Sequence, residues 1–195
     1  MTNAKSLTDV KTLRIQARKH IEEGAVTAGY SADRTEVLKL LNEALATEIV
    51  CVLRYRRHHF MARGIDAKST ADEFLVHSDE EQGHADRIAE RIVQLGGAPD
   101  FAPDSLVSRS HAEYVAGETL VEMIKEDLVA ERIAIDSYRE MIQYLGDKDP
   151  TTSQMLKGIL AVEEEHADEL SDLLQGMPVG AAKPAAVVTQ LSKHV

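Results

Sequence analysis

The residues of this sequence best suited to metal chemistry occur as a repeated motif. The segments EEQGHADRI (80–88) and VEEEHADEL (162–170) both contain Glu-x-x-His-Ala-Asp, the second copy 82 residues after the first. On a helix, a spacing of three residues places the glutamate and the histidine on the same face, one turn apart. Each copy therefore offers a carboxylate and an imidazole to a common ligand, through Glu81 with His84 and through Glu163 with His166.

Two further glutamates lie in the middle of apolar helical stripes, Glu48 within residues 41–55 and Glu131 within residues 124–138. Such stripes face the core of a bundle. Isolated buried carboxylates cost several kcal/mol each or become protonated, so four of them need compensation. Two divalent cations balance four glutamates, and oxygen and imidazole ligands without sulfur suit iron or manganese. We predict a two-metal centre whose ligands are Glu48, Glu81, His84, Glu131, Glu163 and His166.

Four long stretches with apolar residues at helical spacing must position these ligands, and almost no segment alternates as a strand would. The expected helices run from about Asp33 to Arg63, from a capping signal at 69–73 to Gly96-Gly97, from Thr119 to Leu145, and from Asp149-Pro150 to about Gly176. The 22 residues 96–117 are too long for a hairpin turn and suit a crossover along a bundle. The predicted fold is all-α, a four-helix bundle of two hairpins with a long crossover between helices two and three.

An internal repeat supports the two hairpins. An offset of 83 residues places Leu45, Glu48 and Tyr55 on Leu128, Glu131 and Tyr138. The expected organisation is an N-terminal extension (1–32), the bundle (33–176) and a flexible C-terminal tail (177–195).

Composition limits the class of protein. The 195 residues are 44% hydrophobic and 28% charged, which is typical of a soluble globular chain. No apolar run approaches the roughly 18 residues that span a bilayer, and the first 14 residues lack the apolar stretch of a signal peptide. We expect a cytoplasmic protein without membrane contact. The single cysteine, Cys51, excludes an intrachain disulfide framework and a thiolate cluster, and the net charge of −11 argues against a surface wrapped by nucleic acid.

With these residues in place, the sequence resembles the bacterioferritin branch of the ferritin-like superfamily over about residues 35–175. That family's ferroxidase centre takes one Glu from helix one, Glu-x-x-His from helix two, one Glu from helix three and Glu-x-x-His from helix four, which is the order found here. Four sequence segments are also similar to the helices of that family: LLNEALATEIVCVLRY, HADRIAERI, EDLVAER and EEEHADEL. The resemblance implies that Tyr55 gives an electron during oxygen reduction and that Asp127 orients His84.

The sequence also departs from that family. Gln82 stands where bacterioferritin has its haem-ligating Met, so haem is not expected. The family's inner-surface iron histidine falls on Val76, with His77 displaced by one residue. Residues 177–195 have no clear counterpart of the fifth helix of 24-subunit ferritins. Two oligomers are therefore predicted as alternatives, a shell of 24 subunits and a Dps-like shell of 12.

The leading functional prediction is a ferroxidase and iron-storage protein. It would hold two iron ions per subunit, oxidise Fe(II) to Fe(III) with dioxygen or hydrogen peroxide, and mineralise the product inside a homo-oligomeric shell. A less favoured alternative is a Dps-like protein whose basic arm binds DNA, since residues 1–21 carry Lys5, Lys11, Arg14, Arg18 and Lys19 against Asp9. A di-manganese catalase is a further alternative, because its metal ligands are similar. A rubrerythrin-like peroxidase is excluded, because its electron-entry domain binds iron through four cysteines and this sequence has one.

Overall fold

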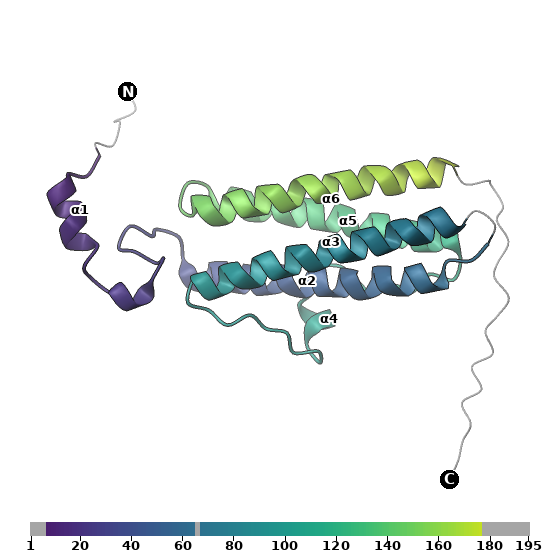
Figure 1. The fold of residues 1–195 in the computed structure, drawn as a ribbon, viewed down its shortest axis with the longest axis horizontal. Helices are drawn as coiled ribbons and strands as arrows, with labels where there is room; N and C mark the ends of the chain where they lie inside the picture. The colour runs from purple at the N-terminus through teal and green to yellow at the C-terminus, as the bar shows by residue number, and fades with distance from the viewer. Residues whose placement is uncertain (1–6, 65–66, 177–195) are drawn as a thin grey trace, which may run out of the picture.

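Four long helices form the body of the protein in a computed structural model that describes residues 7–64 and 67–176. They are α2 (Arg34–Met61), α3 (Ala67–Gln94), α5 (Leu120–Leu145) and α6 (Pro150–Gly176), and they lie side by side as a bundle (Figure 1). Helix α2 packs most extensively on α3, and α5 on α6, so the bundle consists of two hairpins. The chain between them passes along α2 and includes the short α4 (Leu106–Arg109). No strand occurs among the described residues, and the predicted all-α fold with its long crossover is confirmed.

Local capping explains where three of the long helices begin. Asp33 accepts hydrogen bonds from the backbone N–H groups of Thr35 and Glu36, and Thr119 forms a capping box with Glu122. Asp149 accepts a hydrogen bond of 2.9 Å from the backbone N–H of Thr152, at the start of α6. These three starts agree with the sequence prediction.

The predicted start of the second helix was wrong. Helix α3 begins at Ala67, so the capping signal at 69–73 lies inside the helix. Ala67 and Thr70 are both buried, 3% and 1% exposed. Packing of this first turn against the bundle therefore overrides a local preference for a cap, which is weak in comparison.

The core has two apolar clusters along the bundle. One includes Leu45, Ile88 and Ile159, and the other includes Tyr55, Phe74, Ile124 and Leu170. Along each helix, the predicted ligands lie between residues of the first cluster and residues of the second. Apolar packing on both sides therefore separates this polar layer from water.

Buried ion pairs fix the hairpins and the crossover relative to one another. Arg54 on α2 donates through Nε to Oδ1 of Asp127 on α5 at 2.7 Å, and through Nη1 to the carbonyl oxygen of Glu113 in the crossover at 3.1 Å. Arg91 on α3 donates to Asp149 before α6 at 2.9 Å. These contacts determine how α2 and α3 are placed against α5 and α6.

Before the bundle, residues 7–32 contain α1 (Val10–Gln16) and the 3-10 helix η1 (Ile21–Glu23), and Val26, further along this segment, packs in the first apolar cluster. Helix α1 buries none of its residues and lies apart from the bundle (Figure 1). The predicted tail, 177–195, lies outside the described residues. Of the helices in the part of the chain that is described, none is both long enough and apolar enough to cross a membrane.

Candidate metal centre

The six predicted ligands meet in the middle of the bundle, and each long helix contributes at least one. All are buried, with at most 4% of any of them exposed, and they are Glu48 on α2, Glu81 and His84 on α3, Glu131 on α5, and Glu163 and His166 on α6. The structure therefore brings together every residue of the predicted set.

Three carboxylates surround the imidazole of His84. Its Nδ1 lies 2.9 Å from Oε1 of Glu163, 3.2 Å from Oε2 of Glu81 and 3.5 Å from Oε2 of Glu48. One ring nitrogen therefore faces oxygens from three different helices, α2, α3 and α6.

The imidazole of His166 has a similar environment. Its Nδ1 lies 3.6 Å from Oε1 of Glu81, 3.9 Å from Oε2 of Glu163 and 4.0 Å from Oε2 of Glu131. Glu81 and Glu163 thus each present one oxygen to each imidazole. Of the two imidazoles, Glu48 contacts that of His84, and Glu131 contacts that of His166. The result is two adjacent four-residue groups, each with ligand atoms within 4.8 Å of one another, that share two carboxylates.

Four buried atoms of this cluster have no hydrogen-bond partner: Oε2 of Glu48, Oε1 of Glu81, Oε1 of Glu163 and Nδ1 of His166. A buried polar atom left unpaired costs about 1–3 kcal/mol. Each of the four lies 2.9–3.6 Å from an atom of another predicted ligand, and a pair of divalent cations would satisfy them together. The residues present therefore fit two metal ions.

Electrostatics without a metal lead to the same conclusion. Burial, and then repulsion from the charge of Glu81, raises the pKa of Glu48 and of Glu163 well above the usual value. The same two causes raise the pKa of Glu131 to about 7. Burial also acts to raise the pKa of Glu81, but hydrogen bonds with Glu48 and with the two imidazoles outweigh it and hold that pKa below the usual value.

Both imidazoles hold their protons strongly. Burial alone would lower the pKa of His84, yet contacts with Glu48 and Glu81 raise it to about 10. Contacts with Glu81 and Glu131 likewise raise the pKa of His166 to about 9 against the effect of burial. Protons therefore take the place of cations in the metal-free cluster, and they must leave when metal binds.

Comparison with known proteins decides the family. A family model of the ferritin-like domain matches residues 38–178. The bacterioferritin of Mycobacterium avium is 33% identical over 143 residues, which cover 73% of this chain and 86% of that protein. The chain belongs to the ferritin-like family. A DNA protection during starvation protein from Pyrococcus furiosus is 29% identical over 151 residues, 76% of this chain and 82% of that protein.

Solved structures agree with this assignment of the ferritin-like chain. A dodecameric thioferritin of Bacteroides fragilis, described as bacterioferritin-related, superposes with a TM-score of 0.72 at 31% identity and covers 74% of this chain and 88% of its own. Dps from Thermosynechococcus elongatus superposes with a TM-score of 0.70 at 20% identity, over 75% of this chain and 94% of its own, and shares the fold. The sequence-based assignment to a bacterioferritin-like or Dps-like member is confirmed.

Two tyrosines of this ferritin-like chain contact the centre symmetrically. The hydroxyl of Tyr55 on α2 donates to Glu131 on α5, and the hydroxyl of Tyr138 on α5 donates to Glu48 on α2. Burial and the nearby carboxylates raise the pKa of both phenols well above the usual value, so both stay protonated. The resemblance implied a role only for Tyr55, although the 83-residue repeat pairs it with Tyr138.

The expectation that Asp127 orients His84 was wrong. Asp127 accepts from Arg54 at 2.7 Å and contacts Nδ1 of His58 at 2.7 Å. Because the carboxylate of Asp127 pairs with the buried guanidinium of Arg54, Asp127 connects α5 to α2 and does not orient a predicted metal ligand. The carboxylate that does contact a predicted ligand is Glu80, 2.8 Å from Nε2 of His166.

The positions that depart from bacterioferritin have other contacts here. Gln82 donates to Oδ1 of Asp86 at 2.9 Å, one turn along the same helix. Val76 is 50% exposed, whereas the neighbouring His77 is fully buried.

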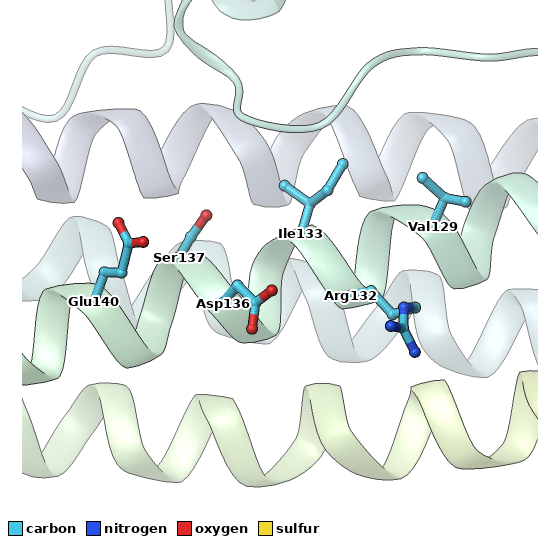
Figure 2. A pocket seen from close by; sticks show the side chains of 6 residues that line it. All are labelled: Val129, Arg132, Ile133, Asp136, Ser137 and Glu140. Carbon is cyan, nitrogen blue, oxygen red and sulfur yellow. The ribbon is translucent and has the colours of Figure 1, made fainter.

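A surface hollow on α5 is separate from the centre. Its lining residues all come from this one helix, and Figure 2 shows them along its outer face: Val129, Arg132, Ile133, Asp136, Ser137 and Glu140. None of the six predicted ligands lines it. With a single helix for a wall, it does not enclose a substrate.

Proposed function

We propose that this chain is a ferroxidase that oxidises Fe(II) to Fe(III) at a centre for two iron ions and stores the product in a homo-oligomeric shell. The observation that carries the proposal is the pair of four-residue groups that share Glu81 and Glu163. Two ions in these groups would lie close together, balanced by four carboxylates and held by one imidazole each.

The chemistry follows from charge. Four anionic ligands favour Fe(III) over Fe(II), because the added positive charge is stabilised by a negative ligand set in a site of low dielectric. Two Fe(II) ions supply two electrons, which with two protons reduce dioxygen to hydrogen peroxide, or hydrogen peroxide to water. Reduction of dioxygen to water takes four electrons and four protons, and Tyr55, hydrogen-bonded to Glu131, is placed to give one of the two electrons beyond those of the Fe(II) pair, with a further Fe(II) giving the other. The apolar clusters on either side limit the access of water and of stray oxidants.

The shell is supported by the relatives. The Bacteroides fragilis protein, at a TM-score of 0.72, is described as dodecameric. This relative favours 12 subunits over 24, and native mass spectrometry of the assembled protein measures the number directly.

The test is the initial rate of aerobic Fe(II) oxidation by chelator-stripped protein, followed by absorbance. Glu48→Ala removes a carboxylate next to His84, and Glu131→Ala removes one next to His166. We expect each variant to abolish the rapid phase of Fe(II) oxidation. The matched control is Glu140→Ala, which removes an exposed carboxylate from α5. Wild-type rates in both Glu48→Ala and Glu131→Ala would refute the assignment of the centre. Manganese in the purified protein, together with oxygen evolution from peroxide, would assign a catalase instead.

A second candidate function is DNA binding by the N-terminal arm. Its support is that α1 stands apart from the bundle with Lys11 and Arg14 exposed, and that Arg18 and Lys19 just after it are also exposed, while Lys5 lies outside the described residues. Neutralising phosphates would make such binding salt-dependent. A gel-shift at low salt tests it against a chain that lacks residues 1–21, and no shift of the intact protein refutes it.

A further inference from the structure

A second group of metal-ligating side chains lies outside the six-residue centre. It consists of Glu73 and His77 on α3 and Glu169 on α6, whose ligand atoms lie within 4.8 Å of one another. Nε2 of His77 is 2.9 Å from Oε2 of Glu169 and 3.6 Å from Oε1 of Glu73. The imidazole is fully buried, whereas the side chains of Glu73 and Glu169 are 37% and 44% exposed.

The contacts of His77 place its Nε2 among ligand atoms that a cation can share. Nδ1 of His77 lies 3.3 Å from the hydroxyl oxygen of Tyr55, which itself donates to Glu131. Nε2 forms a hydrogen bond of 2.9 Å with Oε2 of Glu169, and Oε1 of Glu73 lies 3.6 Å from it. Because a metal ion binds an imidazole nitrogen in place of a proton, a divalent cation here would replace the proton of this hydrogen bond and take both carboxylates as further ligands.

We propose that Glu73, His77 and Glu169 form a third divalent-cation site in each chain. One imidazole and two carboxylates suit a first-row divalent ion such as Fe(II), Mn(II), Co(II) or Zn(II). The tyrosine contact at Nδ1 fixes the ring orientation, as partners of metal-bound imidazoles commonly do. Because both carboxylates are partly exposed, water would complete the coordination and the ion would exchange with solvent.

The position of this third site gives it a role next to the paired centre. The ring of His77 stacks on that of His166, with centroids 4.0 Å apart and planes inclined by 20°. An ion on Nε2 of His77 would thus be accessible from solvent. It would be bound to an imidazole that stacks directly on His166, a ligand of the paired centre. If the ferroxidase function holds, on which this step rests, the third site supplies Fe(II) to the centre.

Calorimetric titration of the chelator-stripped, full-length protein with Co(II) tests binding without redox chemistry. We expect three ions per wild-type chain and two per chain in Glu73→Gln/Glu169→Gln. The matched control is Glu90→Gln/Glu165→Gln, which removes the same charge from exposed positions of the same two helices and should still bind three. A wild-type capacity of two, a capacity of three in the test variant, or an equal loss in the control would each overturn the site.

A second pair of measurements separates this site from the proposed function. Glu48→Ala/Glu131→Ala should lose the paired centre and keep the third Co(II), whereas failure of the ferroxidase proposal would leave the Co(II) capacities as they are. For supply of Fe(II), Glu73→Gln/Glu169→Gln should raise the apparent KM for Fe(II) oxidation several-fold with kcat unchanged. An unchanged KM in a variant that has lost the third Co(II) would refute the supply role.

Discussion

Binding of two divalent cations at the paired centre should release protons, and the structure gives their number. Without metal, burial and repulsion from Glu81 raise the pKa values of Glu48 and Glu163 and so favour their protonated forms, and Glu131, with a pKa of about 7, holds about half a proton at neutral pH. His84 and His166, with pKa values of about 10 and about 9, each carry an extra proton. Since the metal-bound form needs carboxylates and neutral imidazoles, about four protons must leave per pair of ions.

Electroneutrality supports the same number by an independent route. Four carboxylates and two neutral imidazoles carry four negative charges, and an uncompensated charge in a dry site costs several kcal/mol. Without metal, about four protons supply the balance; with metal, two divalent ions supply it. Removing one carboxylate as its amide should therefore lower the release by about one proton.

The assay is anaerobic addition of Co(II) to weakly buffered protein with a pH indicator, calibrated with acid. Glu48→Gln should release about three protons where wild type releases about four, and Glu140→Gln should match wild type. The apparent affinity should rise about a hundredfold per pH unit for each ion, since two protons leave per ion. Release of fewer than about two protons by wild type, or an unchanged release from Glu48→Gln, would refute the reasoning.

Three further outcomes are expected. Tyr55→Phe should remove the tyrosyl radical signal that freeze-quenched electron paramagnetic resonance detects during Fe(II) oxidation, whereas the partly exposed Tyr144→Phe should retain it; a persistent signal in the first variant would assign the electron to another residue. Arg54→Met leaves the buried Asp127 with His58 but without its guanidinium partner, and it should cost about 3 kcal/mol in urea unfolding. Arg56→Met, whose carboxylate partner is exposed, should cost less than about 1 kcal/mol, and equal losses would contradict this. The metal-free protein should lose thermal stability as pH rises from 6.5 to 9 and beyond, because His84 and His166 hold protons in the folded state that the unfolded chain releases. Added Co(II) should reduce that loss, and a melting temperature that rises over this pH range would refute the predicted direction.

The identity of the candidate ligands could be predicted from the sequence because the signal is local. Glu81 and His84 share a helix face whatever that helix packs against, and Glu48 interrupts an apolar stripe that has to face a core. The helical hairpins and the crossover could be predicted for the same reason, since apolar periodicity and loop length are properties of contiguous residues.

Contacts between hairpins could not be predicted in this way. The predicted partner of Asp127 was His84, whereas the packing of α2 on α5 places Nε of Arg54 2.7 Å from Oδ1 of Asp127. The start of α3 was also misplaced, because burial of Ala67 and Thr70 depends on the neighbouring helices.

By itself, then, the sequence determined an all-α bundle and the six acid and imidazole side chains that face its core. Only the tertiary structure decided that Glu81 and Glu163 lie between the two imidazoles, that Tyr55 and Tyr138 each donate to a predicted ligand on the other's helix, and that His77 meets Glu169, 92 residues away. The physical reason is that helical periodicity fixes the direction of a side chain relative to its own axis. The atoms that meet across the core depend on the axial offset and rotation of one helix against another, and these are set by the packing of all four.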